Sequence, residues 1–214
     1  YTWDTPITTD GTVANGALTG NLYIKGSGDP KLVVERLWLL QRRLQERGIK
    51  VIVGDVVLDR SAFQLPPIDP ARFDNEPHRP YNAVPDALLL NYKSFIMHFV
   101  PDAAAGVARI ATEPAVAHLA VPASVPLANG KGHGKSDCGD WRATLKGQFA
   151  NPAQISFAGA YPAACGENSW SVAPAAPDSY APRVFEGMWR ELGGKLTGQV
   201  RIGQAPDSAT PLMT

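Results

Sequence analysis

An acidic residue and an aromatic residue four positions apart are the best-placed candidates for chemistry in this sequence. Asp59 ends the apolar stretch 56–58, and Phe63 precedes a proline-rich stretch. A carboxylate beside an aromatic ring at the mouth of a strand can bind an ammonium group, through an ion pair and through packing against the aliphatic stem. The alternative is a strand-end turn, in which Asp is common. The residues alone leave both interpretations open.

Motifs for nucleophilic catalysis are incomplete. The segment 135–138 (Lys-Ser-Asp-Cys) has Cys138 where a Ser-Asp-Asn element requires an amide, and Leu196 interrupts what would be a Lys-Thr-Gly element at 195–198. No serine stands three residues before a lysine, as a Ser-x-x-Lys pair requires. Ser27, between two glycines, fits a turn better than a nucleophile elbow. We therefore expect no catalytic residue within this chain.

The cysteines and histidines predict no metal site. Cys138 and Cys165 enclose a stretch rich in turn formers and can close a disulfide loop in an oxidising compartment, whereas in a reducing one they would be two buried thiols. The four histidines lack the spacing that brings ligands together on one ion: His78, His98, His118 and His133. No cofactor motif is present either, because the glycines at 130–134 neither follow a clear strand nor open a helix.

Length and composition predict a globular protein of one ordinary domain or two small ones. The chain has 214 residues, of which 44% are hydrophobic, enough for a substantial core. Twenty basic and twenty acidic residues give a formal net charge of zero, which disfavours binding to nucleic acid or to an anionic membrane by bulk charge. No apolar run approaches the roughly 20 residues that a membrane-spanning helix needs.

The N-terminal third has the pattern strand, helix, strand. Turn-forming residues in 3–24 predict a hairpin, with a turn at Asn15-Gly16. Asp29 and Pro30 then predict the cap and first position of an amphipathic helix that ends at Gly48, and its apolar positions recur at helical spacing: Val33, Leu37, Leu40 and Leu44. Residues 50–59 predict strand structure interrupted by a bulge or turn at Gly54-Asp55.

The remainder predicts a β-rich insertion followed by a return to helix and strand. Prolines make 64–85 an ordered loop. Strands are predicted at 88–90, 94–100, 106–112 and 116–121, strand-like alternation at 141–155, and a mobile loop at 129–135. Asp178 predicts the cap of a helix that stops at Gly193-Gly194, before a strand at 196–202.

The fold class is therefore α+β. A mixed α/β outer layer (strand-helix-strand, then helix-strand) is formed by residues 1–85 and 173–214, and a mostly β unit, 86–172, is nested within it.

Several short motifs, taken in their order along the chain, resemble those of one family. They are Gly20-Asn21-Leu22-Tyr23-Ile24, Gly26-Ser27-Gly28-Asp29-Pro30, Gly54-Asp55-Val56-Val57-Leu58-Asp59 with Phe63, Pro80-Tyr81-Asn82-Ala83, the pair Cys138 and Cys165, and Trp189 with Leu192-Gly193-Gly194-Lys195-Leu196-Thr197-Gly198. The family is the class C low-molecular-mass penicillin-binding proteins, which are periplasmic serine D-alanyl-D-alanine carboxypeptidases and endopeptidases. The resemblance covers essentially the whole chain.

This resemblance implies a non-catalytic role for the chain itself. In that family a long insertion splits the catalytic domain, and this chain resembles the insertion together with some adjoining strands of the split catalytic domain. The Ser-x-x-Lys, Ser-x-Asn and Lys-Thr-Gly elements would then lie outside it, and the chain alone would be inactive. Asp59 and Phe63 would help to hold the free amino end of meso-diaminopimelate in the peptidoglycan stem peptide. The cysteine pair suits a periplasmic parent whose signal peptide lies upstream, and no cofactor is implied.

Two other interpretations remain open from the sequence. The chain could be a stand-alone module that binds peptidoglycan or a protein through the loops at 64–85 or 129–135. It could also be a structural spacer that sets the distance between a catalytic domain and the cell wall.

Overall fold

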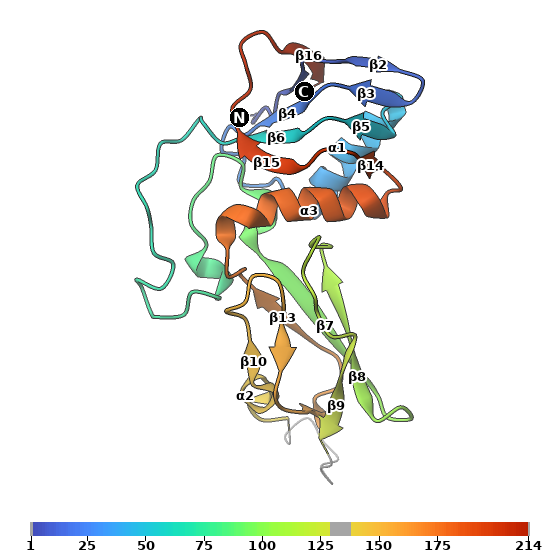
Figure 1. Cartoon of the computed structure of the whole chain (residues 1–214). Coiled ribbons are helices and arrows are strands. Elements are labelled where there is room, and N and C mark those ends of the chain that lie inside the picture. Colours follow the sequence, from blue (N-terminus) through green and yellow to red (C-terminus); the bar gives the residue numbers. More distant parts are fainter. Residues whose placement is uncertain (1, 129–137, 214) are drawn as a thin grey trace.

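A computed structural model describes residues 2–128 and 138–213 (Figure 1). The chain begins with a long, bent hairpin: β1 (Ile7–Thr9) and β2 (Thr12–Ala14) form its first arm, and β3 (Ala17–Thr19) and β4 (Leu22–Lys25) form its second. β2 and β3 pair antiparallel across Asn15-Gly16, and β1 pairs antiparallel with β4. Both turn residues have positive φ, 50° and 84°, which favours this tight hairpin. The predicted hairpin is confirmed.

Helix α1 (Val34–Glu46) buries the predicted apolar face, including Leu37, Leu40 and Leu44. Its predicted start was wrong. Val33 occupies the N-cap position without a side-chain cap. Asp29 instead accepts the backbone N–H of Lys31 at 2.8 Å and forms a 3.0 Å ion pair with Arg36, so its carboxylate closes a turn ahead of the helix. The helix ends just before Gly48, as predicted.

Three stretches of chain run parallel to one another through a bend between two sheets. β5 (Val51–Val53) and β6 (Val56–Asp59) follow α1, and β14 (Lys195–Leu196) and β15 (Val200–Gly203) lie near the C-terminus. β3, β5 and β14 pair parallel in a sheet of order β14-β5-β3-β2. Their continuations pair parallel in a sheet of order β15-β6-β4-β1-β16, where β16 is Thr210–Met213. The result is one curled surface rather than a flat sheet (Figure 1).

A row of glycines forms this bend. Gly20, Gly54 and Gly198 each lie where a strand leaves one sheet and enters the next. A Cβ on Gly54 would collide with the carbonyl oxygen of Gly20, and a Cβ on Gly198 with that of Gly54. The three backbones therefore approach too closely at the bend for any larger residue.

A chain of side-chain hydrogen bonds crosses the sheet beside these glycines. Asp10 Oδ1 accepts the backbone N–H of Asn21 at 2.6 Å, and Asn21 Oδ1 accepts that of Asp55 at 2.8 Å. Asp55 Oδ1 in turn accepts the N–H of Gln199 at 3.1 Å, while its Oδ2 accepts from Arg201 Nε at 2.6 Å. Each polar side chain thus satisfies a backbone donor on the neighbouring strand, at a point where the bend interrupts the regular ladder.

Helix α3 (Pro177–Glu191) lies between the curled sheet and the nested β unit (Figure 1). Its N-cap is Ala176, so the prediction that Asp178 caps this helix was wrong; Asp178 lies in the first turn and pairs with Arg60. The helix stops before Gly193, as predicted. The helix is buried along much of its length, and its buried residues are Tyr180, Ala181, Pro182, Val184, Phe185, Gly187, Met188 and Trp189.

The nested unit is a five-stranded sheet of order β12-β9-β8-β7-β13. Its strands are β7 (Phe95–Asp102), β8 (Val107–Glu113), β9 (Ser124–Ala128), β12 (Tyr161–Pro162) and β13 (Asn168–Val172). The predictions at 94–100 and 106–112 are confirmed. β13 pairs antiparallel with β7, so that Val172 lies opposite Phe95.

Three strand predictions in this unit were wrong. Residues 88–90 form a turn that runs into the 3-10 helix η2 (Leu90–Lys93), and 116–121 make only an isolated bridge at Ala120. The segment 141–155 begins as the short helix α2 (Trp141–Leu145), because Asp140 caps it by accepting the N–H of Ala143 at 3.1 Å. Two-residue strands β10 (Gly147–Gln148) and β11 (Ser156–Phe157) follow it. The predicted mobile loop lies outside the described residues.

The loop prediction for 64–85 is confirmed, since its only helical element is the short η1 (Pro80–Asn82). Asp74 organises the loop by accepting from Tyr81 Oη at 2.6 Å and from Asn82 Nδ2 at 2.7 Å. Another 3-10 turn, η4 (Ala163–Cys165), precedes β13.

We expect a steric clash at the bend to cost more stability than an unfavourable backbone angle in open space. Gly198→Ala places a Cβ against Gly54 and should lower the free energy of unfolding by about 2–4 kcal/mol. Gly106→Ala is the matched control, because Gly106 has a φ of 69° but open space around it, and it should cost only about 1–2 kcal/mol. Urea unfolding of both variants measures the difference, and equal losses would contradict the steric origin of the bend.

Candidate functional site

Asp59 lies at the carboxyl end of β6, between β4 and β15. Its side chain is buried, with the residue only 1% exposed. One carboxylate oxygen accepts the backbone N–H of Ser61 at 2.8 Å, and the other accepts that of Ala205 at 3.0 Å. The carboxylate therefore fixes the turn that leaves β6 and ties it to the segment that follows β15.

The surroundings of Asp59 keep it ionised. Burial alone would raise the pKa of its carboxyl group, but hydrogen bonds from Ser61 and Ala205, together with the charge of Lys25, outweigh burial and leave the pKa below its usual value. A negative charge thus persists beneath the surface at this edge of the sheet.

Phe63 lies on the surface at the same edge. Its N–H donates to the carbonyl oxygen of Arg60 at 3.3 Å, which closes the turn after Asp59. The Cζ end of the ring points at Gly28, where an added Cβ would lie 2.5 Å from Cζ. Phe63 is 41% exposed, so part of the ring is open to solvent. The structure therefore places the two predicted site residues at one sheet edge, Asp59 within the protein and Phe63 above it.

A charged cluster next to these residues was not foreseen from the sequence. Arg60 donates from Nε to Asp86 at 2.9 Å and from Nη1 to Asp178 at 2.8 Å. Lys93 Nζ lies 2.8 Å from the same Asp86, and both of these side chains are almost fully buried. Burial would lower the pKa of Arg60, but Asp178 and Asp86 outweigh this and raise it. The adjacency of Arg60 to Asp59 was the only signal available in the sequence.

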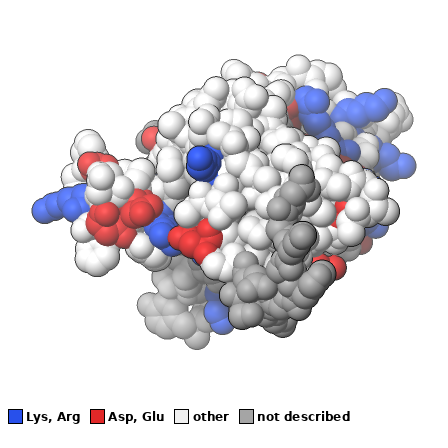
Figure 2. All heavy atoms as spheres, turned by 90° about the horizontal axis from the view of Figure 1, so that it is seen from below, with Lys and Arg blue, Asp and Glu red and all other residues white. Residues whose placement is uncertain are grey.

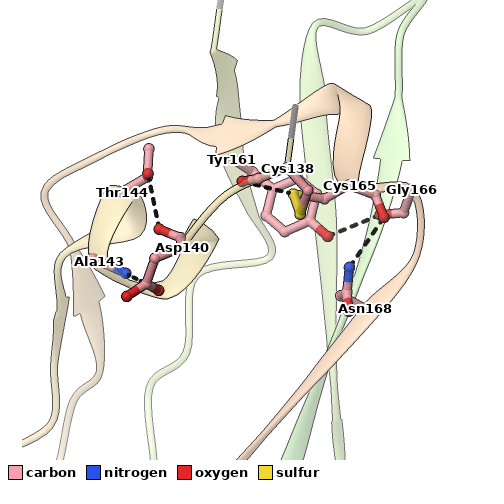
Figure 3. Close-up of a disulfide and its surroundings, with 8 residues drawn as sticks. All are labelled: Cys138, Asp140, Ala143, Thr144, Tyr161, Cys165, Gly166 and Asn168. Carbon is pink, nitrogen blue, oxygen red and sulfur yellow. Dashed lines mark hydrogen bonds between the residues drawn. A yellow bond between two sulfur atoms is a disulfide. The ribbon is translucent and has the colours of Figure 1, made fainter. Parts of the chain in front are cut away.

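The second predicted pair, Cys138 and Cys165, forms a disulfide with a Cα–Cα distance of 4.6 Å (Figure 3). The hydroxyl of Tyr161 donates to the carbonyl oxygen of Gly166 at 2.8 Å, and Asn168 Nδ2 donates to that of Cys165 at 3.0 Å. The bond therefore joins the segment that leads into α2 to the turn between β12 and β13.

No metal site emerges from the described residues. In 2–128 and 138–213, no three His, Cys, Asp or Glu side chains are grouped so as to hold a metal ion. The hydroxyl of Ser27 donates to the carbonyl oxygen of Asp4 at 2.6 Å, as expected of a turn residue. Within those ranges, no helix is both long and apolar enough to cross a membrane. On the face shown in Figure 2, charged side chains of both signs lie in small separate groups around uncharged residues.

The architecture matches solved structures of a penicillin-binding protein over almost the whole chain. With the crystal structure of penicillin binding protein 4 (dacB) from Haemophilus influenzae, the chain has a TM-score of 0.66 and 23% identity, covering 99% of this chain and 45% of that one. With the complex of the same protein with a β-lactam, the TM-score is 0.59 and the identity 22%, covering 99% and 42%. These likenesses define the chain as a region with a penicillin-binding-protein fold.

The sequence specifies the family. The profile of the D-Ala-D-Ala carboxypeptidase 3 (S13) family matches residues 1–214, and the chain belongs to that family. D-alanyl-D-alanine carboxypeptidase DacB from Haemophilus influenzae is 41% identical over 63 residues, which are 29% of this chain and 13% of that protein. The chain spans less than half the length of these relatives. The resemblance inferred from the motifs is confirmed.

Asp59 should make the fold sensitive to acid. Because its pKa is lowered on folding, its contribution to stability is complete above the unfolded value of about 3.8 and is lost as the pH falls through the lower folded value. Asp59→Asn should therefore reduce the loss of unfolding free energy on acidification, measured by urea unfolding between about pH 2 and pH 7. The control Asp207→Asn, at an exposed site, should follow the unmodified chain. Identical acid profiles for Asp59→Asn and the unmodified chain would contradict this role.

The disulfide should contribute measurably to stability. Its reduction should add the mass of two hydrogens and lower the free energy of unfolding by about 2–4 kcal/mol. Cys165→Ser should show a similar loss, and added reductant should then have no further effect. A chain whose mass and stability do not respond to reductant would show that the two thiols are not joined.

Proposed function

We propose that this chain is the accessory, substrate-positioning region of a periplasmic serine-type D-Ala-D-Ala carboxypeptidase or endopeptidase that acts on peptidoglycan stem peptides. The single observation that carries the proposal is the match of all 214 residues to the S13 family in a sequence with no Ser-x-x-Lys pair. The nucleophile, its lysine and the Ser-x-Asn and Lys-Thr-Gly elements belong to residues outside this chain. The chain alone is therefore inactive.

The proposed substrate contact is the free amino end of meso-diaminopimelate, held near Phe63 and Asp59. An ammonium group is attracted to the face of an aromatic ring, and its aliphatic stem packs on the same ring. The part of Phe63 that is open to solvent offers such a face. The ionised Asp59 adds a negative potential from within the protein, because its pKa is lowered. In this role the chain orients the substrate and other residues break the bond.

Two further parts of the proposal concern organisation and compartment. Residues 1–85 and 173–214 form one unit and 86–172 a nested subdomain, which is supported by their separate sheets. A periplasmic location is supported by the disulfide, which persists in oxidising compartments.

Substitution of Phe63 in the complete protein tests the proposed role. Phe63→Ala should raise KM for a stem peptide with a free diaminopimelate amine by about fivefold, the equivalent of about 1 kcal/mol of cation–π attraction, and should leave small ester substrates unaffected. Trp38→Ala is the control, because Trp38 is similarly exposed (47%) but lies on α1.

Equal losses on the peptide and the ester would contradict a role in specificity. Calorimetry would distinguish the stand-alone alternative. Binding of stem peptide by the isolated chain that Phe73→Ala abolishes would favour a module that uses the loop 64–85, where Phe73 is 84% exposed.

A further inference from the structure

We infer that Arg60 is a positioning residue for substrate specificity: by linking Asp86 to Asp178 it holds the turn that presents the Phe63 ring to the substrate's amino group. This inference rests on the proposed function and adds to it a residue that does not itself contact the substrate. Four observations carry it: the paired contacts of Arg60, the buried pair beneath it, the backbone around Lys93, and the connection to Gly28.

The guanidinium of Arg60 joins three segments that are distant in sequence. Arg60 lies in the turn after β6, Asp86 follows the long loop, and Asp178 lies in the first turn of α3. The Nε and Nη1 contacts, at 2.9 and 2.8 Å, use different edges of the planar group. A guanidinium can satisfy two carboxylates at fixed angles, whereas a lysine ammonium behaves as a point charge. The two contacts thus fix the orientation of the turn that carries Arg60, in addition to neutralising the charge of Arg60.

Asp86 is a rigid anchor for this arrangement. One of its oxygens also accepts the backbone N–H of Leu88 at 2.9 Å, and the carboxylate is paired with Lys93 Nζ at 2.8 Å. The Asp86 and Lys93 side chains are only 2% and 3% exposed, so the pair is shielded from solvent. Two cations and two anions balance within the cluster. Asp86 therefore keeps a partner when Arg60 is replaced, and the core beneath the turn is not left with an unpaired charge.

The backbone at and before Lys93, one partner of this pair, takes an unfavourable conformation. Asn91, Tyr92 and Lys93 have φ values of 42°, 53° and 47°, in the left-handed region that residues other than glycine rarely occupy. Asn91 is fixed on both sides, because its N–H donates to the carbonyl oxygen of Leu32 at 2.9 Å and its Oδ1 accepts the N–H of Val34 at 3.3 Å. Strain of this kind persists only where the surrounding structure imposes it, and such sites often have a function.

The anchor reaches Phe63 by a short route. The carbonyl oxygen of Ala87, next to Asp86, accepts the N–H of Gly28 at 2.7 Å. The Cζ end of the Phe63 ring meets Gly28. Arg60 therefore holds the turn above the same segment that supports the ring from below. Without Arg60, the turn keeps the bond from the Ser61 N–H to Asp59 and the bond from the Phe63 N–H to the residue 60 carbonyl, but it loses its links to Asp86 and to α3, and the ring is held less firmly.

The test compares two substrates that differ only in the amine. In the complete protein, KM and kcat are measured for a stem peptide with a free diaminopimelate side-chain amine and for the same peptide with that amine acetylated. Arg60→Gln should raise KM for the free amine at least fivefold, leave kcat unchanged, and leave the acetylated peptide unaffected. Arg60→Lys should give an intermediate KM. Arg79→Gln, an exposed arginine near the far end of the same loop, is the control and should change neither value.

Several results would overturn the inference. The first is an unchanged preference for the free amine in Arg60→Gln, and the second is an equal rise in KM for both peptides. The third is a KM for Arg60→Lys equal to that of Arg60→Gln, with thermal unfolding showing that both variants are destabilised. Phe63→Ala separates this failure from failure of the proposed function. If Phe63→Ala removes the preference and Arg60→Gln does not, only the role of Arg60 is refuted. If Phe63→Ala itself leaves the preference intact, the proposed function fails.

Discussion

The close approach of three backbones at Gly20, Gly54 and Gly198 is the constraint on which the rest of this structure depends. Because no side chain separates them, the paired strands can turn together from one sheet into the next. The turn delivers the carboxyl ends of β4, β6 and β15 to one edge, where Asp59 receives N–H groups from two segments. The polar side chains of Asn21 and Asp55 then satisfy the donors that the bend exposes. Sheet curvature and site geometry thus have the same origin.

Hydrophobic periodicity and turn motifs predicted the secondary structure correctly where one continuous segment of the sequence determines it. The spacing of Leu37, Leu40 and Leu44 predicted the buried face of α1, and Asn15-Gly16 predicted a hairpin. Caps were less reliable, because Asp29 and Asp178 found arginine partners elsewhere. Arg60 pairs with a residue 118 positions away, a contact that no local pattern contains. At 141–145, an apolar alternation was outweighed by the cap that Asp140 provides.

In the candidate site, too, features set by neighbouring residues could be predicted, and features set by residues distant in sequence could not. The position of Asp59 at a strand end could be predicted, since an apolar run precedes it directly. Its burial could not, because the donor that completes its shell, Ala205, lies 146 residues further on. The left-handed backbone at Lys93 was equally hidden, since Asn91, Tyr92 and Lys93 have no glycine among them to suggest positive φ. What the sequence could not supply was the set of partners brought together by the bend.

The pairing of β7 with β13 has an evolutionary consequence. The nested unit leaves the outer layer through β7 and returns through β13, and Phe95 lies opposite Val172 at that junction. An insert whose two ends lie side by side can be gained, lost or exchanged in a single genetic event, in the way that a surface loop can. The backbone of the surrounding domain does not have to move to accommodate it. The outer layer can therefore keep its curled sheet and its strand-end residues while those parts of the insert that do not contact α3 diverge. The junction marks where a lineage could have acquired the unit, and where protein engineers could excise or transplant it.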